Sequence, residues 1–206
     1  MPRARRMWIV ALALVCAATV WFARAAGRRG GAAALMGERV VSLESLPDEC
    51  PIEAPRAVVI QKSNRALGLY VDGRRVGAYR IGLGRNPEGY KEREGDRRTP
   101  EGTYFICTRN ARSRFHLFLG ISYPGPGDAD RGLGGDMVTS EQRRAILEAA
   151  RDGRQPPWDT PLGGEVGIHG GGGGWDWTLG CIALDNSAVE HLWDMLRIGD
   201  PVVIVP

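Results

Sequence analysis

The chain has 206 residues, of which 43% are apolar and 25% charged, and it contains 29 glycines and 13 prolines. This composition excludes collagen-like, coiled-coil and fully disordered chains, and the many glycines and prolines favour short strands joined by turns. The net charge is +3, but residues 1–29 carry six arginines and no acidic residue, so the remaining chain has 21 basic and 24 acidic residues, a net charge of −3. A weakly acidic body lacks the clustered basic surface that nucleic acids require, so we expect no nucleic-acid partner.

Residues 1–29 have the features of an N-terminal targeting segment. Three arginines within the first six residues precede an uncharged apolar run over residues 7–23, and an Ala-Arg-Ala sequence that a signal peptidase can recognise follows. The run is also long enough for a transmembrane helix, so a cleaved signal peptide and a retained signal anchor are both open. Both predict an exported body in the periplasm or cell envelope, and the second adds an anchor in the cytoplasmic membrane through residues 7–23.

Residues 30–56 are predicted to form a linker between this leader and the folded body. Glycine, alanine and arginine dominate the first part of the segment, and three prolines interrupt the second part. Such a composition is typical of a tether rather than of a packed element. The folded domain is therefore expected to span residues 57–206.

The body is expected to consist mainly of β-strands. Asp72-Gly73 is a strong signal for a two-residue hairpin turn, and residues 84–100, which are rich in glycine and charge, predict an exposed loop. Apolar runs with β-branched residues or alternating polarity predict strands at residues 57–61, 67–71, 75–82, 102–108, 116–122 and 202–205.

Helix signals occur at two places. Thr139 and Gln142 have the spacing of a capping box, and residues 143–151 after them are rich in helix-forming residues. A second helix is expected to begin at Asp185 or Asn186, because the apolar residues that follow lie on one helical face: Val189, Leu192, Trp193 and Leu196. The prediction is thus a mainly β, β-sandwich-like or barrel-like fold with two short helices, preceded by an N-terminal apolar leader.

The exported body contains three cysteines, Cys50, Cys107 and Cys181. An odd number in an oxidising compartment leaves at least one thiol free unless it pairs with another chain. The sequence does not decide whether Cys50 and Cys107 form a disulfide.

Cys181 is the candidate nucleophile, because it follows Gly180 in a potential turn and lies twelve residues after His169. We expect His169 to act as its base and to lower the pKa of the thiol. Gly180 permits a tight turn, so the backbone N–H groups of Gly180 and Cys181 are candidate donors to an oxyanion. From the spacing alone, a buried cysteine beside a core histidine explains the pattern equally well.

Two local motifs connect His169 and Cys181 with a known protein family. Ile168-His169-Gly170, followed by Thr178-x-Gly180-Cys181-Ile182, resembles the signature of the L,D-transpeptidase catalytic domain family (the YkuD type), and residues 95–105 resemble the T-P-x-G-x-[FY] segment of that family. The resemblance covers about residues 57–206. It implies a β-rich fold, a cysteine nucleophile and peptidoglycan stem peptides as substrate.

The resemblance also implies a role for each residue of the motif. Cys181 is expected to be the nucleophile and His169 the general base and acid, with the Gly170 carbonyl orienting the imidazole. Gly180 is expected to supply an oxyanion N–H, and Thr178 to support the turn. No metal ion or organic cofactor is expected.

Trp175 and Trp177 flank the proposed site in a glycine-rich loop. They are candidates for binding a stem peptide or a glycan, and packing within the loop is the alternative interpretation.

The sequence departs from the family pattern at Leu179, where many members have histidine, and at Ala183, where many have arginine or asparagine. The interval between His169 and Cys181 is also shorter than in many members. Residues 115–117 and 121–124 resemble a branch of the family that includes murein hydrolases. These departures leave the nucleophile unchanged but leave the acceptor open.

The function expected from the sequence is that of an exported peptidoglycan L,D-transpeptidase, in which an amine acceptor resolves a thioester on Cys181 and cross-links the cell wall. The first alternative is a hydrolase of the same fold, an L,D-carboxypeptidase or a murein peptidase or amidase that cleaves cross-links. The second alternative is a non-catalytic module that binds the cell wall.

Overall fold

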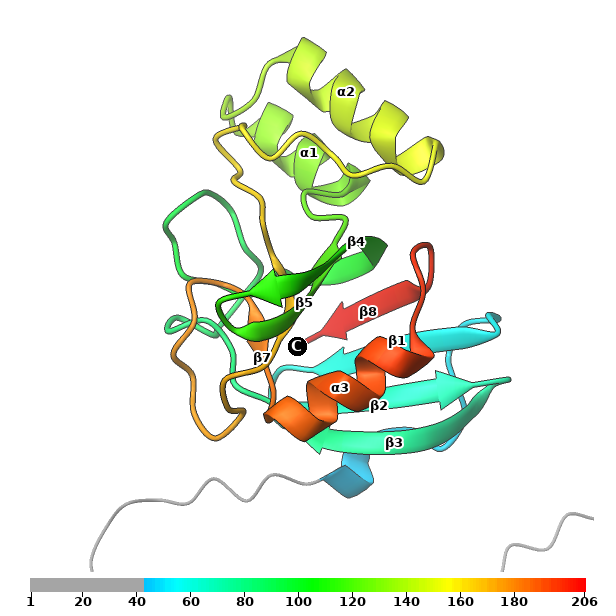
Figure 1. Ribbon diagram of the computed structural model, residues 1–206. Coiled ribbons are helices and arrows are strands. Elements are labelled where there is room, and N and C mark those ends of the chain that lie inside the picture. The colour runs from blue at the N-terminus through cyan, green and yellow to red at the C-terminus, as the bar shows by residue number, and fades with distance from the viewer. Residues whose placement is uncertain (1–42) are drawn as a thin grey trace, which may run out of the picture. The chain divides into compact units, whose positions relative to one another are not determined.

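The computed structural model describes residues 43–206 (Figure 1). The predicted leader and the first part of the predicted linker lie outside the described residues. Among the described residues, no helix is both long enough and apolar enough to cross a membrane.

The domain is built on one curled sheet (Figure 1). Its eight strands follow the order β3-β2-β1-β8-β4-β5-β6-β7. β1 pairs with β8 and β6 pairs with β7 in parallel, and the other neighbouring strands are antiparallel. The strands are β1 (Arg56–Gln61), β2 (Ala66–Val71), β3 (Arg74–Arg80), β4 (Gly102–Ser113), β5 (His116–Ile121), β6 (Gly167–His169), β7 (Ile182–Ala183) and β8 (Pro201–Val205).

The two ends of the sheet approach each other. Isolated bridges join Gly82 to Ala183 and Gly84 to Thr178, so the chain that leaves β3 runs beside β7. The long strand β4 pairs with β8 in one half of the sheet and with β5 in the other. The expected sandwich-like, mainly β fold is therefore confirmed, with β4 common to its two halves.

The six strands predicted from apolar alternation are all present. The predicted hairpin turn is confirmed too, because Asp72 (φ 47°) and Gly73 (φ 79°) both adopt the left-handed backbone that a tight turn of this kind requires. The structure adds β6 and β7, which are only three and two residues long and carry too few residues for alternation to be recognised.

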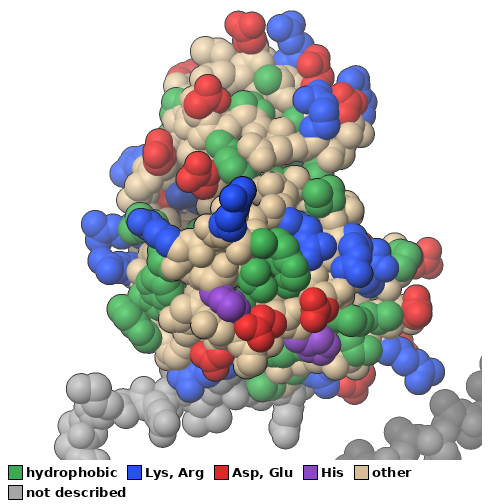
Figure 2. Space-filling view, in the orientation of Figure 1, with side chains coloured by type: hydrophobic (Ala, Val, Ile, Leu, Met, Phe, Trp, Pro, Cys, Tyr) green, Lys and Arg blue, Asp and Glu red, His purple; other side chains and the backbone are tan. Residues whose placement is uncertain are grey.

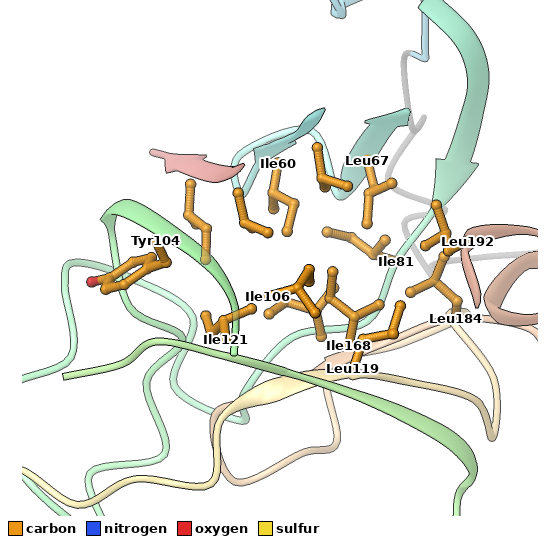
Figure 3. Close-up of a cluster of buried hydrophobic side chains, with 14 of the residues drawn as sticks. Ile60, Leu67, Ile81, Tyr104, Ile106, Leu119, Ile121, Ile168, Leu184 and Leu192 are labelled. Carbon is orange, nitrogen blue, oxygen red and sulfur yellow. The ribbon is translucent and has the colours of Figure 1, made fainter. Parts of the chain in front are cut away.

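The main core lies between the two halves of the sheet (Figure 3). Ile60 and Leu67 enter it from β1 and β2, and Ile106, Ile121 and Ile168 enter it from β4, β5 and β6. All five side chains are fully buried. Ile168 therefore anchors the strand that ends at His169 directly in the core.

The described residues contain three α-helices, so the expectation of two short helices was incomplete. The helices are α1 (Pro126–Gly134), α2 (Ser140–Arg151) and α3 (Asn186–Met195), and a short 3-10 helix, η1 (Leu43–Ser45), precedes the sheet. The predicted capping box of α2 is present, with Gln142 N donating to Thr139 Oγ1 and Thr139 N donating to Gln142 Oε1. α3 begins after Asp185, as predicted.

After its first residue, α1 has only Ala129 and Leu133 as apolar residues, too few for a helical periodicity to be recognised in the sequence. Its N-terminus is held by Asp128, which accepts hydrogen bonds from Gly125 N at 2.8 Å and from the Tyr104 hydroxyl at 3.0 Å. Tyr104 lies 24 residues earlier in the chain. The helix therefore depends on a long-range contact that periodicity cannot report. In Figure 1, α1 and α2 lie together at one end of the sheet.

The segment before β1 contacts the sheet. Leu46 is buried, Cys50 N donates to Gly73 O at 2.8 Å, and the Tyr70 hydroxyl donates to Pro47 O at 2.7 Å. The last part of residues 30–56 thus packs against the β2–β3 hairpin.

Acidic and basic side chains are interspersed over the face of the molecule shown in Figure 2, in keeping with the nearly balanced charge of the body.

Two isoleucines test the position of the core. Ile60→Ala should lower the free energy of unfolding by about 2–5 kcal/mol, because it leaves a cavity between the two halves of the sheet. Ile198, 59% exposed, is the matched control, and Ile198→Ala should change that free energy by less than about 0.5 kcal/mol. Urea denaturation followed by circular dichroism measures both. Equal effects of the two substitutions would contradict the core described here.

Candidate active site

Parallel pairing of β6 and β7 brings His169 and Cys181 to one face of the sheet. Ile168 lies opposite Ile182 and His169 lies opposite Ala183 in the register. Ile168 and Ile182 are buried in the main core. Because side chains alternate along a strand, His169 lies on the face away from that core, and the same alternation continued by one residue before β7 would place Cys181 there too.

The imidazole of His169 is packed between aromatic rings. It is stacked on Phe115, with ring centroids 4.7 Å apart and an angle of 24° between the planes, and it meets the edge of Trp177 at 5.6 Å. Only 2% of the residue is exposed. These contacts fix the plane of the ring and keep water from most of its surface.

A backbone hydrogen bond determines which nitrogen of His169 carries the proton. Nδ1 lies 2.6 Å from the carbonyl oxygen of Gly170. Since a carbonyl oxygen only accepts, Nδ1 donates, and Nε2 of the neutral ring is the basic nitrogen. Burial lowers the pKa of His169, while the hydrogen bond to Gly170 acts in the opposite direction. The imidazole is therefore a neutral base with Nε2 as its acceptor. The contact with Gly170 is the one that the family resemblance implies.

Thr178 braces the turn that carries the cysteine. Its hydroxyl oxygen Oγ1 accepts a hydrogen bond from Gly180 N at 3.1 Å and donates one to Cys181 O at 2.7 Å. Gly180 has a φ of 139°, and a Cβ at this position would lie 2.7 Å from Arg98 O. Any other residue at position 180 would strain the backbone and clash with that carbonyl.

The expected role of Gly180 as an oxyanion donor needs correction. Its N–H already donates to Thr178 Oγ1 and so points into the turn. Among the hydrogen bonds of residues 43–206, none is donated by Cys181 N. Of the two oxyanion donors that the sequence suggested, the backbone N–H of Cys181 is thus the one still available to a substrate.

The thiol of Cys181 contacts the backbone just before β6. Sγ donates to Glu165 O at 3.5 Å, and among the described residues it makes no hydrogen bond to His169. Burial raises the pKa of the Cys181 thiol to about 11, and a backbone hydrogen bond from Gly167 and the charge of Lys91 act in the opposite direction. The expectation of a lowered thiol pKa was therefore wrong, because the desolvation of the thiolate outweighs the groups that favour it.

Cys50, Cys107 and Cys181 are all free thiols in the described part of the chain, so Cys50 and Cys107 do not form a disulfide here. Burial also raises the pKa of Cys107 to about 11. Within residues 43–206, no group of three His, Cys, Asp or Glu side chains is placed to hold a metal ion.

The two tryptophans have different surroundings. Trp177 packs against His169 and donates from Nε1 to Gly172 O at 3.0 Å. Trp175 is 66% exposed, with its ring centroid 6.3 Å from that of Trp177. Trp177 thus supports the histidine, whereas Trp175 presents an aromatic surface to the solvent beside it.

Sequence reasoning missed two supports of the site. Phe115 was noted only as part of a motif, although it stacks on His169. Arg65 forms an ion pair with Asp176, with Nη2 and Oδ2 2.7 Å apart, and Asp176 Oδ1 also accepts from Leu83 N. Asp176 thereby holds the loop between His169 and Cys181. Its partner Arg65 lies 111 residues away, so no local signal could have revealed the pair.

This chain belongs to the L,D-transpeptidase catalytic domain family (YkuD), whose family model matches residues 55–204. The comparison confirms the resemblance that the motifs around His169 and Cys181 indicated. No match was found among the curated proteins.

Solved structures with this fold include the helical cell shape determining protein Pgp2 (K307A mutant) of Campylobacter jejuni, with 22% identity and a TM-score of 0.53, covering 82% of this chain and 51% of that one. An L,D-transpeptidase (Yku) of Stackebrandtia nassauensis has 15% identity and a TM-score of 0.49, with 82% and 63% covered. The L,D-transpeptidase (residues 123–326) of Xylanimonas cellulosilytica has 16% identity and a TM-score of 0.45, with 76% and 63% covered. This chain thus spans less than two thirds of each of these chains.

The protonation state of Cys181 is open to direct measurement. Because burial raises the pKa of its thiol to about 11, the rate of alkylation by iodoacetamide should keep increasing with pH beyond about 8.5, the ordinary value for a thiol. Mass spectrometry of the peptide that contains Cys181 follows the reaction at this residue alone. A rate that levels off at or below that ordinary value would contradict the raised pKa.

Proposed function

We propose that this chain is an exported peptidoglycan L,D-transpeptidase in which Cys181 forms a thioester with a stem peptide. The observation that carries the proposal is the hydrogen bond between His169 Nδ1 and Gly170 O, which leaves Nε2 as a base on the same face of the sheet as Cys181. Membership of the L,D-transpeptidase family supports the choice of peptidoglycan peptides as substrate.

In the first half of the proposed reaction, the neutral thiol loses its proton to His169 Nε2 as Sγ attacks a carbonyl carbon of the stem peptide, on the carboxyl side of a dibasic amino acid. Sγ gives up its contact with Glu165 O to do so. The carbonyl oxygen becomes negatively charged and accepts a hydrogen bond from Cys181 N. The protonated imidazole then gives its proton to the leaving amine, and the thioester remains on Cys181.

In the second half, an amine of another stem peptide attacks the thioester. His169 takes a proton from the amine and returns it to the sulfur as the C–S bond breaks. The product is a peptide cross-link, and the enzyme returns to its starting state. Water can attack the same thioester, so a hydrolase with this site differs only in its acceptor.

Two further elements of the proposal concern substrate and location. Trp175 is a candidate for contact with the stem peptide or its glycan, because it exposes a large aromatic surface next to the ring that packs on His169. The basic, apolar and Ala-Arg-Ala sequence of residues 1–29 supports export to the periplasm or cell envelope. After export, this leader is either cleaved or retained as a membrane anchor through residues 7–23.

Two cysteine substitutions test the nucleophile. Cys181→Ala should lower turnover of the full chain on a defined tetrapeptide by at least about 10³-fold, since the groups of such a site act as a unit. Cys107→Ala is the matched control, because Cys107 is also a free thiol whose pKa burial raises to about 11. That variant should keep near-normal turnover, as measured by mass spectrometry of the products.

The same product analysis identifies the acceptor. A cross-linked dimer that lacks the terminal amino acid of the donor is the expected product. A shortened monomer alone would favour the hydrolase. Normal turnover by Cys181→Ala would overturn the mechanism in both forms.

A further inference from the structure

A buried lysine lies beside the turn that carries the proposed nucleophile. Lys91 belongs to residues 84–100, which the sequence predicted to be an exposed loop, yet only 4% of its side chain is exposed. Its ammonium group donates to Arg93 O at 2.8 Å and to Asp96 Oδ1 at 2.6 Å. A lysine is rarely buried to this extent without a specific reason.

The ammonium of Lys91 is adjacent to Gly180. A Cβ built on Gly180 would lie 4.0 Å from Lys91 Nζ and 2.7 Å from Arg98 O, so the loop and the turn are in close contact. An ammonium group has three N–H donors, and Lys91 uses two of them. Among residues 43–206, no hydrogen-bond acceptor takes the third, and the ammonium lies over the ring of Tyr123, 5.9 Å from its centroid. The positive charge thus stands next to the residue that precedes Cys181.

Asp96 fixes the position of this charge. Besides Lys91, its carboxylate accepts hydrogen bonds from the backbone N–H groups of Glu92, Arg93 and Arg98 at 2.8 to 3.0 Å. These bonds fold the loop around the ion pair and hold the Arg98 carbonyl against Gly180. The ammonium is therefore preorganised rather than mobile.

We propose that Lys91 is a positioning residue for the reaction, whose fixed positive charge favours the thiolate of Cys181. The inference rests on the proposed function in so far as Cys181 is the nucleophile. Lys91 touches neither the sulfur nor the imidazole by a hydrogen bond in the described residues, and it acts through the electrostatic field at the turn.

Glu165 and Lys91 act on the charge of the Cys181 thiol from different segments, and His169 is its proposed base. His169 lies on β6 and is held neutral by burial. Glu165, in the segment before β6, disfavours the thiolate through its negative charge, and Lys91 favours it through its positive charge. Burial outweighs both charges, so the pKa of Cys181 is raised, and Lys91 limits the rise. Removal of the lysine should therefore raise this pKa further.

Iodoacetamide alkylation of Cys181 in the full chain tests this prediction, with each rate followed by mass spectrometry of its peptide over a range of pH. Lys91→Met should slow alkylation at least about threefold at about pH 9, with the pH profile moved to higher pH, because the favourable charge is lost. Lys91→Arg keeps a positive charge and should restore most of the rate. Asp96→Asn removes the opposing charge of the ion pair and should increase the rate.

Lys62 provides the matched control. It is equally buried and supports the same loop, because its ammonium donates to Gly89 O, Thr99 O and Glu101. Lys62→Met should leave the pH profile of Cys181 unchanged. Equal slowing by the Lys62 and Lys91 variants would overturn the inference, as would a Lys91→Met profile like that of the wild type.

Asp96→Asn decides the matter if Lys91→Met fails to fold. A slower or unchanged rate in this variant would also overturn the inference. An equal increase of the rate in Lys62→Met would overturn it as well, because opening of the same loop exposes the thiol and raises the rate without any change at the Lys91–Asp96 ion pair. Alkylation does not require turnover. A wild-type profile in Lys91→Met together with inactive Cys181→Ala would thus reject the role of Lys91 and retain the proposed function.

Discussion

The parallel pairing of β6 with β7 is the constraint on which the candidate site depends. The pairing of these strands of three and two residues places His169 opposite Ala183 and Cys181 directly before β7, and the burial of Ile168 and Ile182 sets the register. A shift of one residue would turn either the histidine toward the core or its apolar neighbours toward the solvent. The core of the sheet therefore does more than stabilise the fold, because it also decides which side chains face the substrate.

Burial also determines the chemistry of the resting site. It raises the pKa of the Cys181 thiol and lowers that of His169, so both groups are neutral before substrate binds. A neutral pair avoids the cost of burying two charges without adequate partners. In the proposed mechanism the thiol loses its proton only as its bond to the substrate forms. Lys91 favours the negative charge that develops on the sulfur, and the Cys181 N–H stabilises the negative charge on the carbonyl oxygen. Phe115 and Trp177 hold the base in place throughout.

The sequence predicted the parts of the fold that local patterns encode. Alternating apolar residues identified six strands, and the spacing of Thr139 and Gln142 identified the start of α2. It missed α1 because that helix has few apolar residues and is held in part by the contact of Asp128 with Tyr104, 24 residues earlier in the chain. At the site, the motif identified the residues, but the hydrogen bond that occupies Gly180 N and the raised pKa of Cys181 depend on Thr178 and on burial, which become defined only in three dimensions.

The central claim is that Cys181 accepts an acyl group with His169 as its base. A carbapenem tests it most directly, because its strained carbonyl is an acyl donor to an activated thiol and leaves a stable mass. Mass spectrometry of the intact chain, followed by peptide mapping, should show one adduct, located on Cys181, that forms much more slowly in His169→Ala. An adduct on Cys50 or Cys107, or an equal rate in His169→Ala, would contradict the account.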